Sequence, residues 1–172
     1  MTILPIVIGP DPRLKEAAKT VEQVDDIIRE LFDDMLETMY QARGVGLAAV
    51  QVGIMKRLIV IDIADDEEKK PIYMANPEII NFSEEEIIRN EGCLSFPGQR
   101  LDIKRPIMVT VKFLDYHNNE QVLEFTDWLA TAIQHEIDHL DGRLLVDYLS
   151  NIKRNVAMRK LQKLKKLKNS FL

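Results

Sequence analysis

Residues 134–140 of the chain read Gln134-His135-Glu136-Ile137-Asp138-His139-Leu140, and we expect the fold to be built around this stretch. On an α-helix, residues four apart lie one above the other, so His135 and His139 can direct an imidazole nitrogen toward the same point. Glu136 would then reach a water molecule on a metal ion at that point without being a ligand, which suits a general base. A lone histidine on an apolar helix face is more often a hydrogen-bonded core residue. Two histidines at this spacing, with a glutamate between them, predict a metal-binding helix.

A third ligand must come from elsewhere, because catalytic metal sites usually have three protein ligands and one open position for water. A His-x-x-Gly-x-x-His peptidase would need a ligand at position 145, which is Leu145, and no carboxylate side chain follows Asp147. Asp147 stays open as a candidate. We favour Cys93, the only cysteine, because a thiolate with two imidazoles suits Zn²⁺ or Fe²⁺. A solitary cysteine is more often a small buried apolar residue, so this assignment depends on the need for one more soft ligand.

Three blocks of the chain resemble the three motifs of peptide deformylases. They are Gly44-Val45-Gly46-Leu47-Ala48-Ala49-Val50-Gln51, Glu91-Gly92-Cys93-Leu94-Ser95 and Gln134-His135-Glu136-Ile137-Asp138-His139. The blocks follow the order and spacing typical of the bacterial members, so the resemblance covers nearly the whole chain. It implies an enzyme that removes the formyl group from the N-terminal methionine of newly made polypeptides and releases formate. It also implies one divalent metal ion on Cys93, His135 and His139, with Fe²⁺ favoured over Zn²⁺.

The resemblance also implies roles for the residues around the metal. Glu136 would move the proton of the attacking water, while the Gln51 side-chain amide and the Leu94 backbone N–H would stabilise the oxygen that gains charge. Glu91 is expected to pair with Arg105 and so to steady the cysteine loop. We expect the substrate to be bound by Val45, Gly46, Gly92, Arg100, Trp128, Thr131 and Ala132.

Helical periodicity points to part of this substrate pocket independently. Thr131 and Ala132 lie one turn before His135, and Trp128 lies two turns before it, so all three should share its face. An equally open interpretation is that Trp128 belongs to the core. Deformylases more often have a glycine and an aliphatic residue where Asp127 and Trp128 stand, so the pocket should differ in shape.

The segment 44–49 also fits the G-x-G-x-x-A pattern of a dinucleotide-binding turn. Such a turn follows a strand and opens a helix. Here a helix is expected before the segment and a strand over 57–63 after it, so we reject the nucleotide interpretation. Residues without bulk allow another backbone to approach closely. In deformylases that backbone is the substrate, which pairs with this segment as an added strand.

Periodicity and turn residues, together with the resemblance, predict an α+β fold. We expect antiparallel β-sheets packed around the helix that bears the metal ligands, a region like a helical hairpin at the N-terminus, and a C-terminal helix. Thr126 or Asp127 should cap the central helix, and Gly142 should end it. The other expected helices are 12–19, 24–40 and 151–169, and the expected strands are 57–63, 72–74, 78–80, 86–89, 107–113 and 122–125.

Length and composition predict a single globular domain over residues 1–172, with 46% apolar and 30% charged residues. One cysteine excludes an internal disulfide framework and fits a reducing compartment. We see neither an apolar run of about 18 residues nor a signal peptide, and therefore expect a cytoplasmic protein without a membrane partner.

The net charge of −5 conceals a basic C-terminus. From Ser150 onward there are eight Lys or Arg residues and no Asp or Glu, whereas the preceding part carries 15 basic and 28 acidic residues. We expect residues 151–172 to form a basic helix. A solvated helix face is the simpler interpretation, and docking on ribosomal RNA, where nascent chains emerge, is the sharper one.

Two other functions stay open at this point. A general metallopeptidase would use the same residues to cleave internal peptide bonds. A ribosome- or RNA-binding module would use the basic tail, and its metal would be purely structural with four protein ligands.

Overall fold

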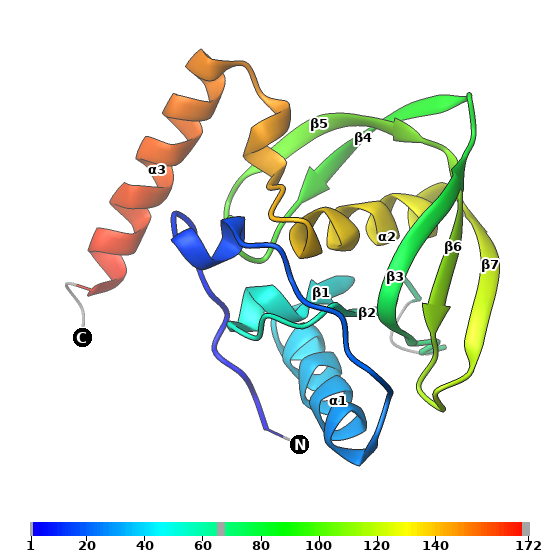
Figure 1. Cartoon of the computed structure of the whole chain (residues 1–172). Coiled ribbons are helices and arrows are strands. Elements are labelled where there is room, and N and C mark those ends of the chain that lie inside the picture. The colour runs from blue at the N-terminus through cyan, green and yellow to red at the C-terminus, as the bar shows by residue number, and fades with distance from the viewer. Residues whose placement is uncertain (1, 65–67, 170–172) are drawn as a thin grey trace.

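The structure is a computed structural model that describes residues 2–64 and 68–169, without the side chains of 164–169. The expected α+β fold, with antiparallel sheets around a central helix, is confirmed (Figure 1). One sheet has the strand order β1-β2-β3-β6-β7, and β4 pairs with β5 in a separate hairpin. All of these strand pairs are antiparallel. The strands are β1 (Gly46–Ala48), β2 (Leu58–Ile61), β3 (Ile72–Phe82), β4 (Glu86–Gly92), β5 (Arg100–Pro106), β6 (Met108–Leu114) and β7 (Glu120–Thr126).

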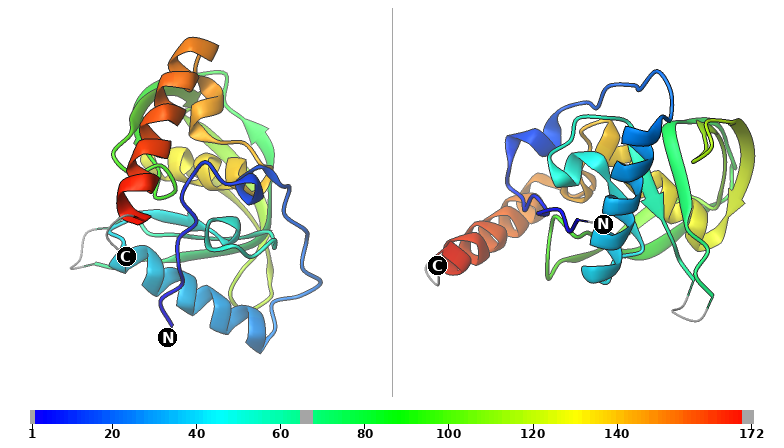
Figure 2. Two further views of the ribbon diagram at one scale, coloured as in Figure 1. Left: turned by 90° about the vertical axis from the view of Figure 1, so that its left-hand side faces the viewer. Right: turned by 90° about the horizontal axis from the view of Figure 1, so that it is seen from below.

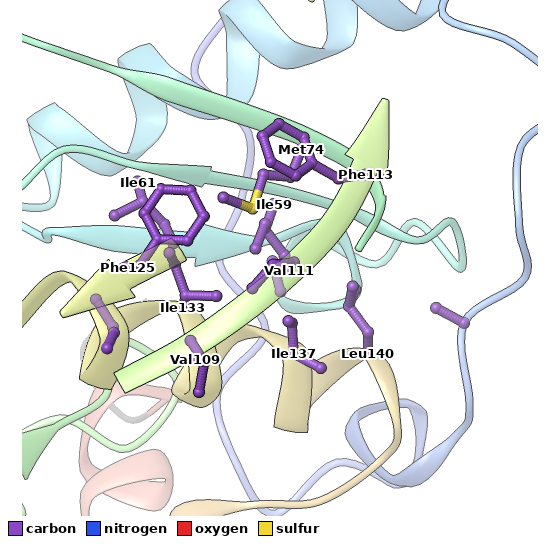
Figure 3. Close-up of a cluster of buried hydrophobic side chains, with 14 of the residues drawn as sticks. Ile59, Ile61, Met74, Val109, Val111, Phe113, Phe125, Ile133, Ile137 and Leu140 are labelled. Carbon is purple, nitrogen blue, oxygen red and sulfur yellow. The ribbon is translucent and has the colours of Figure 1, made fainter. Parts of the chain in front are cut away.

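Helix α2 (Asp127–Leu140) carries the two histidines and packs on the five-stranded sheet. Figure 3 shows Ile133, Ile137 and Leu140 of this helix in one buried cluster with Val109 and Val111 of β6. These three helix positions follow helical spacing, so the opposite face of α2 is left for polar side chains. Burial of this apolar face fixes the orientation of the metal-binding residues.

Helix α2 ends as the sequence predicts, but it begins differently. Gly142 follows the helix with φ +71°, as expected for a glycine that ends a helix. Thr126 occupies the N-cap position, but its side chain makes no capping hydrogen bond. Asp127 is the first helical residue, with φ +55°, and its carboxylate accepts a hydrogen bond from Arg89 instead. Thr126 thus takes one of the two expected capping positions, but it does not cap the helix through a side-chain hydrogen bond.

The N-terminal region contains a single 3-10 turn, Pro12–Lys15, and helix α1 (Asp26–Gln41). The turn is shorter than the helix expected through residue 19. The Asp25 carboxylate accepts the Ile28 N–H at 2.9 Å and so caps α1. Buried α1 residues, including Phe32 and Met35, pack in a second apolar cluster with residues of β1 and β2.

Strand β3 joins the two pieces expected at 72–74 and 78–80. Its register with β6 shifts between Ala75 and Glu78. Pro77 has no amide hydrogen for the sheet, and Asn76 takes φ +52° and bonds the Val21 backbone through both side-chain atoms. The irregularity therefore interrupts the ladder without ending the strand.

Helix α3 (Asn151–Asn169) lies at the side of the molecule away from β6 and β7 (Figures 1 and 2). Ala157 and Leu161 are buried in a third apolar cluster with Leu14, Phe96 and Leu144. Within the described ranges, no helix has both the length and the apolar character needed to cross a membrane.

Candidate metal centre and substrate pocket

Three potential ligands from two distant segments meet beside α2. Cys93 lies between β4 and β5, and His135 and His139 lie on α2. One ligand atom from each lies within 4.8 Å of the others. The Cys93 Sγ is 3.2 Å from His139 Nε2, and the two imidazole rings are 5.1 Å apart between centroids. The structure thus brings together the three residues that the sequence suggested.

The electrostatics of this group suit a cation. Burial lowers the pKa of His139 well below its usual value, so its imidazole is neutral and can act as a ligand. Burial also opposes charge on His135, but hydrogen bonds to Cys93 and Glu91 raise its pKa well above the usual value. The space between the thiol and the imidazoles therefore favours positive charge. One sulfur and two ring nitrogens fit Fe²⁺ or Zn²⁺.

Asp147, the other candidate ligand, lies outside this group. Its carboxylate pairs with Lys15 and accepts the Leu144 N–H at 2.8 Å. Over the part of the chain that the structure describes, the cluster has three ligand groups and not the four typical of a structural metal site.

Glu91 and Arg105 hold His135 from the other side. Burial alone would raise the pKa of Glu91, but hydrogen bonds from His135 and Arg105 outweigh it and lower the pKa. The carboxylate is therefore ionised, and His135 Nδ1 donates to its Oε2 at 2.9 Å. Arg105 contacts both oxygens of Glu91, at 2.6 and 3.0 Å. This arrangement leaves Nε2 of His135 for a metal and fixes the ring orientation.

Arg105 also connects this pair to a second residue of α2. Its Nη1 donates to Asp138 Oδ2 at 2.8 Å, and the Tyr148 hydroxyl donates to the same oxygen at 2.6 Å. Asp138 stands one helical turn from His135. The buried guanidinium thus ties β5 to the metal-binding helix.

Glu136 is a buried carboxylate beside the ligands. Burial raises its pKa to about 7, with further contributions from neighbouring charges. Among the described residues, its Oε2 has no hydrogen-bond partner. A Cβ on Gly46 would lie 2.5 Å from Glu136 Oε1, so the backbone of β1 passes directly against the carboxylate. Such a group can accept and return a proton near neutral pH.

Gln51 lies at the cysteine loop. Its Oε1 accepts the Ala48 N–H at 2.8 Å, which orients the side-chain amide. The Nε2 lies 3.6 Å from Cys93 Sγ and donates to Ser95 Oγ at 3.3 Å. The amide donor is therefore held beside the three potential metal ligands.

A pocket of about 720 Å³ opens beside the metal ligands. All seven residues expected to bind substrate line it, and so does Leu94. Trp128 is 45% exposed, so the interpretation of this residue as core is wrong. Arg100 lies on the wall, where its guanidinium donates to the Asn90 side chain and carbonyl. The expected residues are Val45, Gly46, Gly92, Arg100, Trp128, Thr131 and Ala132.

Sequence reasoning missed other residues of this pocket. They include Arg43, Ile63, Asn90 and residues 96–99. Asn90 lies on β4 one residue before Glu91, but no motif marks it. The extension of β4 into the hairpin with β5 would have been the only signal.

The comparisons with known proteins agree with this geometry. Residues 3–155 match the polypeptide deformylase family. The chain is 53% identical to a peptide deformylase of Rickettsia canadensis over 171 residues, which cover 96% of this chain and 98% of that protein. It is 49% identical to the peptide deformylase of Bartonella tribocorum, with 99% and 97% covered.

Solved structures give the same result for the fold. The crystal structure of peptide deformylase from Ehrlichia chaffeensis has a TM-score of 0.92 at 42% identity, and the match covers 97% of this chain and 99% of that one. The E. chaffeensis enzyme in complex with actinonin has a TM-score of 0.91 at 45% identity, with 95% and 98% covered. The chain described here therefore belongs to the polypeptide deformylase family.

Proposed function

We propose that the protein is a metal-dependent hydrolase that removes the N-formyl group from the N-terminal methionine of newly made polypeptides and releases formate. The observation that carries this proposal is the convergence of Cys93, His135 and His139 beside the buried carboxylate of Glu136 in one pocket. Three ligands leave a position open for chemistry, which a structural metal site does not.

Cys93, His135 and His139 would hold the metal ion. When bound, such a cation supplies Lewis acidity that makes water nucleophilic near neutral pH and polarises a carbonyl. We infer Fe²⁺ rather than Zn²⁺ from the resemblance in the motifs, since the donor set accepts both. Elemental analysis of protein purified without air would identify the ion, and bound zinc would contradict the choice of iron.

Glu136 takes the proton of the attacking water and returns it to the departing amine. Its raised pKa and its buried Oε2, which has no hydrogen-bond partner among the described residues, support this assignment. Positioned acid–base groups typically contribute about 10²–10⁴ in rate. The Gln51 amide and the Leu94 backbone N–H would stabilise the formyl oxygen as it gains charge. Loss of one such donor typically costs about 2.7–4 kcal/mol.

The substrate peptide would bind along β1. This strand lies at one edge of the five-stranded sheet, and its first residue, Gly46, lines the pocket together with the preceding Val45. An exposed sheet edge can pair with an extended peptide. Gly92 and Arg100 also line the pocket, and the methionine side chain would run along Thr131 and Ala132 toward Trp128. The proposed contacts thus all lie in one pocket.

Substrate discrimination tests this function against a general metallopeptidase. A formyl-methionyl tripeptide should be hydrolysed with release of formate, whereas its acetylated counterpart and an N-blocked peptide cut at an internal bond should not be. Equal turnover of the internal bond would favour the metallopeptidase.

We also propose that α3 docks on ribosomal RNA. The support is the charge of the C-terminal segment, eight basic residues without an acidic one, and the peripheral place of the helix. Replacing the exposed Lys153, Lys160 and Lys163 by Gln keeps the buried Ala157 and Leu161 in place. Ribosome affinity should fall and its salt dependence should weaken.

A matched control for this experiment is available on the body of the protein. Lys104 and Lys112 are also exposed, and their replacement by Gln should leave ribosome affinity unchanged. Unchanged affinity after the α3 substitutions would refute the docking proposal. A cytoplasmic location, which the single cysteine supports, stays a prediction.

A further inference from the structure

The pocket follows one face of α2 from His135 to the first turn of the helix. His135, Ala132, Thr131 and Trp128 all line it. Trp128 stands seven positions before His135, so the two Cα atoms are on the order of 10 Å apart along the helix axis. A methionine side chain attached close to the metal would run along Thr131 and Ala132 before it met the indole.

The indole of Trp128 is stacked against an arginine from the neighbouring hairpin. The guanidinium carbon of Arg89, on β4, lies 4.8 Å from the centroid of the Trp128 ring. The Arg89 side chain is only 17% exposed, and a cation over an indole is held more strongly where water is excluded. Trp128 therefore has a fixed support although 45% of its surface is exposed.

Asp127 holds the arginine in place. Its Oδ1 accepts from Arg89 Nη2 at 3.1 Å. Asp127 has φ +55°, a conformation that glycine adopts freely and other residues adopt at a cost of about 1 kcal/mol or more. The carboxylate makes this ion pair from the first turn of the helix, where a negative charge is favoured. The strained residue is thus the one that anchors the support of Trp128.

Few other contacts fix the guanidinium. Among the described residues, Arg89 Nε is buried without a hydrogen-bond partner. The stack on Trp128 and the pair with Asp127 are therefore the contacts that place it. Loss of either should release the indole.

We propose that Arg89 and Asp127 are positioning residues that fix the Trp128 indole as the end wall of the pocket, and that this wall limits the length of the first side chain of the substrate. The inference rests on the proposed function, since the substrate is taken to be an N-formyl peptide whose first side chain lies along α2. Arg89 would thus help to select the substrate, although it lies on β4 of the two-stranded hairpin and not on α2.

The test is a ratio of kcat/KM values. Formyl tripeptides are compared that carry methionine or an unbranched side chain two or three carbons longer at the first position. A ratio of long to methionine substrate is insensitive to the amount of folded or metal-loaded enzyme, because both substrates use the same active sites. Loss of wall packing should raise the ratio about tenfold or more in Trp128→Ala.

Two further variants separate the effect of the clamp, which is the pair of Arg89 and Asp127, from the effect of the end wall, which is the Trp128 indole. Arg89→Gln and Asp127→Gly should raise the ratio in the same direction by a smaller factor, and Asp127→Gly also removes the backbone strain. Asp127→Gly combined with Trp128→Ala should give the ratio of Trp128→Ala alone, because both act through one indole. Lys104→Gln breaks another ion pair of the same hairpin and should leave the ratio unchanged.

An unchanged ratio in Trp128→Ala would overturn the end wall. A raised ratio in that variant, with unchanged ratios in Arg89→Gln and Asp127→Gly, would overturn the clamp. Wild-type enzyme that hydrolyses none of the formyl peptides would instead contradict the proposed function, so the two failures are distinguishable.

Discussion

At the scale of single residues, the close approach of β1 to Glu136 is the most sensitive feature of the site. Gly46→Ala would place a methyl carbon 2.5 Å from Glu136 Oε1. The carboxylate must then move, and we expect kcat to fall by about 10²-fold or more while metal content stays unchanged. Steady-state kinetics with elemental analysis checks this outcome.

Gly92→Ala is the matched control for the added methyl group. Its Cβ would come no closer than 3.6 Å to a neighbouring atom, so it adds the same bulk to the pocket without approaching Glu136. It should lower kcat much less than Gly46→Ala does. Wild-type kcat in Gly46→Ala would show that the position of Glu136 is not critical.

The buried pair of Glu91 and Arg105 gives a second prediction at this scale. Both side chains are at most 5% exposed. Glu91→Gln leaves the guanidinium poorly compensated and removes the carboxylate that orients His135. We expect metal affinity to fall about 10–100-fold and the free energy of unfolding to fall by about 3–5 kcal/mol. Metal titration and urea unfolding measure the two effects, and a wild-type value of either would count against this role.

Single residues also show how far the sequence could predict the site. The histidines and Glu136 are close in sequence on one helix, so their spacing alone predicts their geometry. The assignment of Cys93 as a ligand needed two further arguments. One was that a third ligand was missing, and the other was the resemblance of the motifs. Asn90 reaches the pocket through the pairing of β4 with β5, and Ile63 reaches it from the segment just after β2. No local sequence pattern records either position.

At the scale of elements, the end of α2 depends on Gly142. This residue has φ +71°, and a Cβ there would collide with the backbone carbonyl of Lys15. Gly142→Ala should lower the free energy of unfolding by more than about 1 kcal/mol. Gly98→Ala is the control, because Gly98 has φ +72° with open space around it. Equal losses in thermal unfolding would mean that the collision contributes nothing.

The hairpin between β6 and β7 gives a prediction with a pH dependence. Burial opposes ionisation of Asp115, but hydrogen bonds from Asn119, Gln121 and the His117 backbone outweigh it and lower the pKa. A lowered pKa in the folded state contributes stability above the unfolded value of about 3.9 and loses it as the pH falls through the folded value. Asp115→Asn should therefore unfold more easily than wild type at pH 7, by about 1 kcal/mol.

The stability difference between wild type and Asp115→Asn also depends on pH. Below about pH 3.9 the difference between wild type and Asp115→Asn should shrink, because the wild-type carboxylate becomes protonated. Urea unfolding of both proteins at the two pH values measures it. A difference that grows on acidification would show that the carboxylate does not carry the stability.

The sequence predicts helices and strands well where one face of the element is apolar. It predicts them poorly where pairing with another strand determines the structure. The helices α1 and α2 follow apolar spacing closely. Strand β5 was not predicted. Its charged and apolar residues do alternate, but Arg105 breaks the pattern because it faces inward to its buried partner Glu91. The three-residue strand β1 depends on β2 and carries too little pattern of its own.

At the scale of the whole molecule, the metal site connects two parts that are otherwise separate in the topology. The loop after β4 belongs to the two-stranded hairpin, whereas α2 packs on the five-stranded sheet. A cation on Cys93 and the two histidines would bind only the folded arrangement and so stabilise it. Removal of the metal by a chelator should lower the Tm.

Cys93→Ala is the control for this effect. Without the thiolate, metal binding should be weak, and the chelator should change the Tm little. An equal decrease in wild type and Cys93→Ala would mean that the stabilising ion binds elsewhere. Sheet order and the position of the hairpin over α2 could not be read from the sequence, because contacts between distant segments determine them.

We propose that Glu136 performs the proton transfer beside a metal ion that Cys93, His135 and His139 would hold. The most direct measurement is the metal content and turnover of Glu136→Gln purified without air, with a formyl-methionyl peptide as substrate. We predict about one metal ion per chain. We also predict that kcat falls by roughly 10²–10⁴-fold, the range typical of general acid–base catalysis. Near-normal turnover with the metal in place would contradict the account.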